Sequence, residues 1–127
     1  MGSAASVVLI IDDDDDTLAS VGELLEANGF ETRRASSGAA ALALLDSLAP
    51  SERSPSLVLL DWLLPGGPSG GALVEALRRR LGERLPIVIV SGDPQALAEA
   101  RAAKVSDYLP KPFAAADLVD VVHLHCP

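Results

Sequence analysis

Short runs of aliphatic and β-branched residues alternate along the chain with segments that repeat apolar residues at helical spacing. The runs at 7–11, 57–60 and 86–90 contain no charged residue. Such strands are buried on both faces, which occurs mainly in parallel sheets covered by helices on each side. The alternation therefore predicts an α/β chain of five successive strand–helix units without an internal linker.

Two weaker strands complete this pattern. The charged residues of 31–35 suggest an edge strand, and Tyr108-Leu109 marks a fifth strand before Lys111. Apolar spacing and capping residues predict helices in five segments, 18–28, 37–48, 73–82, 96–103 and 117–124. Residues 65–71 are rich in proline and glycine and predict a loop.

Composition limits the possible classes of protein. The 127 residues are 49% hydrophobic and 22% charged, which excludes intrinsic disorder. A net charge of −8 argues against direct binding to nucleic acid. No apolar run approaches the ~20 residues of a membrane span, and the single cysteine, Cys126, suits a reducing compartment. We therefore expect a cytoplasmic protein without membrane contact.

Polar side chains follow the ends of the predicted strands. Asp12 and Asp13 follow the first strand, Asp61 the third, Ser91 the fourth and Lys111 the fifth. A parallel sheet gathers such residues at one edge, where ligands bind. Clustered carboxylates need a cation, and hard oxygen ligands suit Mg²⁺. With a hydroxyl and an ammonium they form a site for a phosphoryl group, for which a carboxylate can be the nucleophile.

These motifs together resemble the receiver domain of bacterial two-component response regulators. The matching segments are Ile10-Ile11-Asp12-Asp13, Leu59-Leu60-Asp61 with Pro65, Val90-Ser91-Gly92 and residues 107–113. The resemblance implies a flavodoxin-like (βα)5 three-layer sandwich with a parallel five-stranded sheet of order 2-1-3-4-5. We assign 7–124 to this domain, 1–6 to an N-terminal extension or a cloning remnant, and 125–127 to a C-terminal tail. The implied function is that of a phosphoacceptor signalling domain rather than an enzyme.

The resemblance also implies roles for individual residues. Asp61 would accept the phosphoryl group, which Lys111 and Ser91 would contact. Mg²⁺, for which Mn²⁺ can substitute, would be held by Asp12, Asp13, Asp61 and the backbone carbonyl of Leu63, with Asp13 favoured as a direct ligand. Ser91 and Tyr108 match switch positions, Gly92 leaves room for phosphate access, and the Lys111–Pro112 peptide bond would be cis.

The same resemblance implies partners. The phosphoryl donor would be a histidine kinase or a histidine phosphotransfer domain. The signal would pass through helix 96–103, the fifth strand and helix 117–124 to a downstream protein or a covalently linked output domain. One departure concerns the loop after Asp61, because Ser69 stands where the family commonly has glycine and Gly70 follows one residue later.

Two other functions stay open at this point. A degenerate receiver would bind proteins without cycling phosphate, although the complete set of strand-end residues argues against it. Residues 13–17 also fit the DxDxT motif of haloacid-dehalogenase-type phosphatases, with Asp13 as the nucleophile. That assignment leaves Asp61 without a role and lacks a later acidic metal motif.

Several nearby residues have a simpler structural interpretation. Asp15 and Asp16 are expected to interact with the start of the first helix, and Asp14 is left open between this role and the metal. Trp62 is expected to pack rather than to contact a ligand. The last residues, His123, His125 and Cys126, are expected at a frayed chain end.

Overall fold

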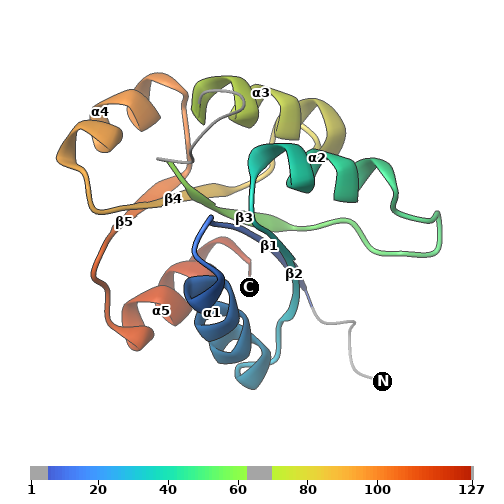
Figure 1. Ribbon diagram of the computed structural model, residues 1–127, viewed down its shortest axis with the longest axis horizontal. Coiled ribbons are helices and arrows are strands. Elements are labelled where there is room, and N and C mark those ends of the chain that lie inside the picture. Colours follow the sequence, from blue (N-terminus) through green and yellow to red (C-terminus); the bar gives the residue numbers. More distant parts are fainter. Residues whose placement is uncertain (1–5, 63–69, 127) are drawn as a thin grey trace.

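Five parallel strands form one sheet, in the order β2-β1-β3-β4-β5, in a computed structural model that describes residues 6–62 and 70–126 (Figure 1). The strands are β1 (Val7–Ile11), β2 (Glu31–Ala35), β3 (Leu57–Asp61), β4 (Ile87–Ser91) and β5 (Asp107–Pro110). Each neighbouring pair is parallel. The predicted strand order is confirmed, and the charged strand β2 lies at an edge.

Helices cover both faces of this sheet. They are α1 (Asp15–Ala27), α2 (Gly38–Asp46), α3 (Gly70–Leu81), α4 (Pro94–Ala102) and α5 (Ala115–His125). α1 and α5 lie on one face, and α2, α3 and α4 lie on the other (Figure 1). None of the helices in the described ranges is long and apolar enough to cross a membrane.

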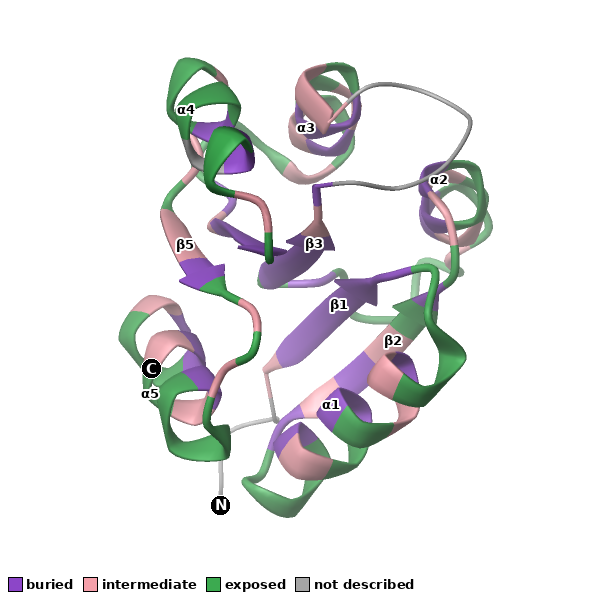
Figure 2. Cartoon of the chain, turned by 60° about the vertical axis from the view of Figure 1, so that its left-hand side comes forward, coloured by how far each residue is buried: buried purple, intermediate pink, exposed green. Residues whose placement is uncertain are grey.

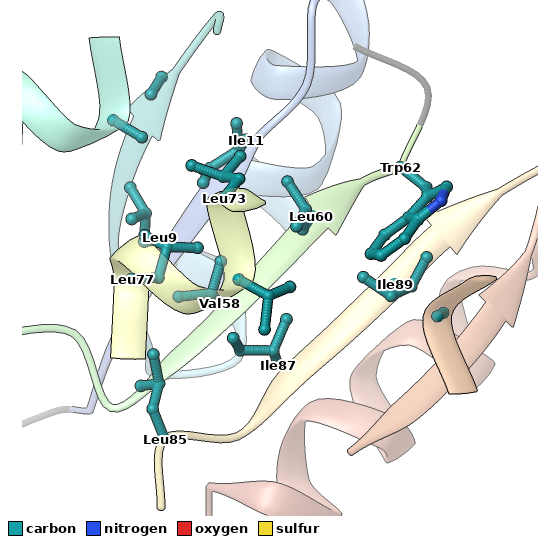
Figure 3. Packing of buried hydrophobic residues seen from close by; sticks show 14 of the residues in the cluster. Leu9, Ile11, Val58, Leu60, Trp62, Leu73, Leu77, Leu85, Ile87 and Ile89 are labelled. Atoms are coloured by element: carbon teal, nitrogen blue, oxygen red, sulfur yellow. The ribbon is translucent and has the colours of Figure 1, made fainter. Parts of the chain in front are cut away.

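The strand side chains divide between two hydrophobic clusters. Successive residues of a strand point to opposite faces, so Leu60 and Ile89 pack toward α3 and α4, as Figure 3 shows, while Leu59 and Val88 pack toward α1 and α5. The central strands are buried along nearly their whole length (Figure 2). This two-sided burial explains why their sequences are uniformly apolar.

Side-chain caps set the starts of α2 and α4. Ser37 Oγ accepts a hydrogen bond from Ala40 N at the start of α2. Asp93 Oδ1 accepts one from Gln95 N at the start of α4, with Pro94 in the first turn. This helix starts two residues before the expected Ala96, because its Asp-Pro start signal precedes the first apolar residue.

The boundaries around α3 differ from the expected ones. The sequence predicts a loop over 65–71, but Gly70 and Gly71 belong to the first turn of α3. The rest of the expected loop, which includes Ser69, lies outside the described residues, as does Leu63 before it.

His123, His125 and Cys126 contact the rest of the fold, so the expected frayed end is wrong for these three residues. α5 continues to His125, whose Nε2 lies 3.0 Å from Asp107 Oδ2. The ring of His123 lies 4.9 Å from that of Phe30, measured between centroids. Cys126 is buried in the cluster under α1 and α5. Contacts with β5 and with the core therefore hold the last turn, which the spacing of the histidines alone does not reveal.

Candidate functional site

Three carboxylates meet at the carboxyl edge of the sheet. Asp12 and Asp13 follow β1, and Asp61 ends β3, which pairs directly with β1. One oxygen from each carboxylate lies within 4.8 Å of the others. The parallel pairing of β1 with β3 thus brings together residues that are nearly fifty positions apart in the sequence.

Lys111 brings a positive charge into this cluster. Its Nζ lies 2.9 Å from Asp12 Oδ2 and 3.6 Å from Asp61 Oδ2. The backbone N–H of Lys111 donates to the carbonyl of Ser91 (2.9 Å), which ties the residue to the end of β4. The peptide bond from Lys111 to Pro112 is cis, in agreement with the expectation from the sequence.

The surroundings of Lys111 keep its ammonium charged. Burial opposes the charge, but the hydrogen bond to Asp12 and the attraction of Asp61 outweigh it and raise the pKa of Lys111 above its ordinary value. The stabilisation that depends on the charge of Lys111 is therefore fully present below the ordinary lysine pKa. It is lost as the pH rises through the raised pKa of Lys111.

The three carboxylates differ in their exposure to solvent. Asp12 is 3% exposed, and both of its oxygens accept hydrogen bonds, Oδ1 from Asp14 N (3.0 Å) and Oδ2 from Lys111. Asp61 is partly buried, whereas Asp13 is exposed. Asp13 is thus the carboxylate most open to a metal ion. The set consists of oxygen donors only, which fits Mg²⁺.

The remaining acids of the run belong to α1. Asp14 Oδ1 accepts from Asp16 N (3.0 Å), and Asp14 Oδ2 accepts from the Thr17 hydroxyl (2.9 Å). The hydrogen bond from Thr17 is the main cause that lowers the pKa of Asp14. Asp14 is therefore the helix cap, and Asp15 and Asp16 are exposed in the first turn, where acids favour the helix dipole.

Ser91 and Tyr108 meet under the loop after β4. Ser91 is fully buried, and its Oγ accepts a hydrogen bond from Asp93 N (3.1 Å). The Tyr108 hydroxyl donates to the carbonyl of Ser91 (3.2 Å) and lies 3.5 Å from that of Asp93. The tyrosine is thus already turned inward. Gly92 is exposed beside them, and a Cβ there would make only ordinary contact with the Lys111 carbonyl, at 3.7 Å.

Trp62 makes a contact that the sequence analysis misses. The indole is 7% exposed, which agrees with the expected packing role, but its Nε1 also donates to Glu99 Oε2 of α4 (2.7 Å). The two residues are 37 positions apart in the sequence. No spacing pattern in the sequence links Trp62, which follows β3, to Glu99 on α4.

Comparison with known proteins agrees with this geometry. The chain matches the response regulator receiver domain family over residues 8–123. It is 39% identical over 98 residues to the phosphate regulon transcriptional regulatory protein PhoB of Rhizobium meliloti (strain 1021), covering 75% of this chain and 40% of that protein. It is 34% identical over 99 residues to PhoB of Escherichia coli (strain K12), with 76% and 41% covered. The chain thus spans about 40% of the length of these relatives.

Solved structures show the same fold. The receiver domain of NtrX from Brucella abortus superimposes with a TM-score of 0.80 and 31% identity, covering 93% of this chain and 96% of that one. Chemotaxis response regulator CheY4 of Vibrio cholerae gives a TM-score of 0.81 at 24% identity, with 94% and 98% covered. The CheY4 likeness supports the fold alone.

Replacing Lys111 with methionine tests the pairing at the site. We expect Lys111→Met to lower the free energy of unfolding by about 1–3 kcal/mol, because the buried Asp12 carboxylate loses its hydrogen-bond partner. Urea unfolding at pH 7 without divalent ions measures this change. Arg101→Met removes an exposed positive charge from α4 and should change the free energy by less than about 0.5 kcal/mol. An equal effect of both variants would contradict the pairing.

Proposed function

Because the chain belongs to the response regulator receiver domain family, we propose that it is a phosphoacceptor signalling domain and that Asp61 accepts the phosphoryl group. The observation that carries this proposal is the position of the Asp61 carboxylate. Its Oδ2 lies 3.6 Å from Lys111 Nζ, and the cluster it forms with Asp12 and Asp13 fits within 4.8 Å.

The chemistry follows from the groups around Asp61. An oxygen of its carboxylate attacks the phosphorus of a phosphohistidine, the bond from phosphorus to the imidazole nitrogen breaks, and the imidazole leaves with the bonding electrons and takes up a proton. The product on this chain is an acyl phosphate. Lys111 places its ammonium beside the phosphoryl oxygens. Ser91 accepts from Asp93 N, which leaves its hydroxyl proton available to donate.

Asp12, Asp13 and Asp61 are the residues that would hold Mg²⁺ or Mn²⁺, together with the carbonyl of Leu63. Asp13 is the direct ligand in this proposal, since Asp12 already accepts two hydrogen bonds. A bound divalent cation supplies positive charge that offsets the carboxylates and the incoming phosphoryl oxygens.

The proposed donor is a histidine kinase or a histidine phosphotransfer domain. The proposed receiver of the signal is a downstream protein or a covalently linked output domain. The PhoB relatives are transcriptional regulatory proteins by name, and this chain spans only about 40% of their length. Its net charge of −8 argues that any binding to DNA would be done by another domain.

The switch in this proposal involves Ser91 and Tyr108. A phosphoryl group on Asp61 attracts the Ser91 hydroxyl, which at present accepts from Asp93 N. The Tyr108 hydroxyl donates to the carbonyl of Ser91 in the same loop. A movement of this loop therefore acts on α4, β5 and α5. The switch has two packing states of Ser91 and Tyr108, and the inward Tyr108 of this structure belongs to one of them.

The metal site predicts an effect of Asp13→Asn. We expect the variant to bind Mg²⁺ roughly tenfold more weakly or worse, since even an outer-shell substitution has that effect at a metal site. Titration of Trp62 fluorescence measures binding, because Trp62 follows Asp61 and is the single tryptophan of the chain. Asp15→Asn, in the same acidic run, should bind like the wild type. Unchanged affinity in Asp13→Asn would remove Asp13 from the metal site.

The acceptor role predicts an effect of Asp61→Asn. After incubation with a small phosphodonor and Mg²⁺, intact-mass analysis should show one added phosphoryl group on the wild type and none on Asp61→Asn, because the amide is not a nucleophile for phosphorus. Labelling that survives Asp61→Asn and disappears in Asp13→Asn would instead support the phosphatase with Asp13 as nucleophile. A wild type that never becomes labelled would support the degenerate receiver.

The proposed switch predicts which residues change their amide exchange when the Asp61 site is occupied. With beryllofluoride as a phosphoryl mimic, changes in amide exchange should concentrate between Ser91 and Tyr108, and Ser91→Ala should reduce them because it removes the hydroxyl that contacts the mimic. Ser20→Ala, at an exposed position of α1, serves as the control. Changes confined to residues 12–16 and Asp61 would mean that the site binds the mimic without switching.

A further inference from the structure

Among the described side chains of α4, few apolar groups hold the helix against the rest of the molecule. Among its described side chains only Ala96 and Ala100 are buried, and each offers one methyl group. A cleft of about 850 Å³ lies between α3 and the C-terminal part of α4, where Glu99 and Ala102 line it. In contrast, α3 buries Leu73, Val74 and Leu77. Apolar packing therefore contributes less to the position of α4 than to that of α3.

Two polar bridges span the gap to α4. At its C-terminal end, Arg78 of α3 donates to the carbonyls of Ala103 (3.2 Å) and Lys104 (2.9 Å). In its middle, Glu99 accepts the hydrogen bond from Trp62 Nε1 (2.7 Å). Because the carboxylate is charged, this second bond is of the stronger, charge-assisted kind.

Trp62 itself has little freedom to move. Its ring lies at the end of β3 beside Ile89 of β4 (Figure 3). The start of α3 packs so closely on the ring that a Cβ on Gly70 would lie 2.7 Å from two ring carbons. Trp62 also follows Asp61 directly in the chain. Its indole N–H is thus a fixed donor whose position depends on the backbone of the proposed acceptor.

We propose that the Trp62–Glu99 hydrogen bond couples the Asp61 site to α4, with Glu99 as a positioning residue that holds α4 in its unmodified arrangement. This inference rests on the proposed function of Asp61. An interaction that stabilises the unmodified arrangement opposes occupancy of the site, and the coupling is reciprocal. Loss of the bond should therefore strengthen binding at Asp61, although Glu99 is on another element.

The test is a double-mutant cycle with beryllofluoride at fixed Mg²⁺, followed by amide NMR. Glu99→Ala and Trp62→Phe should each lower the half-saturating beryllium concentration by about threefold to tenfold, the range expected for one hydrogen bond of about 1 kcal/mol. The double variant should change it no further than either single variant. Glu99→Gln keeps an acceptor oxygen and should fall between Glu99→Ala and the wild type.

Glu83→Ala is the matched control, because Glu83 lines the same cleft and the structure describes no bond from it to Trp62. It should bind beryllofluoride like the wild type. If Glu99→Ala matches this control, weakens binding, or acts equally in the Trp62→Phe background, the proposed coupling is wrong. Glu99 is exposed, so its variants should fold even if Trp62→Phe does not. In that case the test is whether the half-saturating beryllium concentration rises in the order Glu99→Ala, Glu99→Gln, wild type.

Amide exchange of unmodified protein separates failure of the coupling from failure of the proposed function. Glu99→Ala should speed exchange of the α4 amides by about threefold to tenfold relative to Glu83→Ala. Exchange equal to that of the control shows that the bond does not hold α4. The other contrary result is faster exchange in Glu99→Ala while Asp61 binds neither the mimic nor a phosphoryl group. That result would show that the bond holds α4 but that Asp61 is not an acceptor, and it would overturn the coupling.

Discussion

The ion pair between Lys111 and Asp12 is the interaction on which the edge of the sheet depends. One ammonium lies among three carboxylates that fit within 4.8 Å. Without a cation, such a cluster would be destabilised by mutual repulsion in partly buried surroundings. Lys111 pairs with the most buried acid, Asp12, and Asp13 remains in contact with water. One ammonium thus offsets part of the repulsion among the three carboxylates, and the remaining negative charge is available to a divalent cation.

The order of the strands makes this arrangement possible. β1 and β3 are neighbours in the middle of the sheet, so their carboxylates meet, while β4 and β5 continue the sheet on the side from which Lys111 reaches back. Lys111 is also tied by its backbone to the Ser91 carbonyl, which in turn accepts from the Tyr108 hydroxyl. The charged cluster and the aromatic residue therefore share one short segment at the end of β4.

Much of the fold and of the site could be predicted from the sequence, because both depend on signals that are local along the chain. Uniformly apolar runs mark two-sided burial, and the residue after each run occupies the carboxyl edge, which identifies Asp12, Asp61 and Ser91. Lys111 follows the weaker fifth strand in the same way. The bond between Trp62 and Glu99 has no such signal, since it depends on how far α4 lies from the sheet. The packed C-terminus is missed for the same reason: the contact of His125 with Asp107 becomes visible only when α5 is placed beside β5.

The sheet also divides the molecule into two half-cores, because alternate strand residues point to opposite faces. One half-core joins α1 and α5 to the strands through large side chains such as Leu25 and Leu118, both fully buried. The other contains α4, whose buried side chains, among those that the structure describes, are Ala96 and Ala100. A displacement of α4 would uncover the methyl groups of these two alanines and would leave the opposite half-core intact. On this face of the sheet the freedom to rearrange therefore belongs to α4, because α3 beside it is anchored by Leu73, Val74 and Leu77.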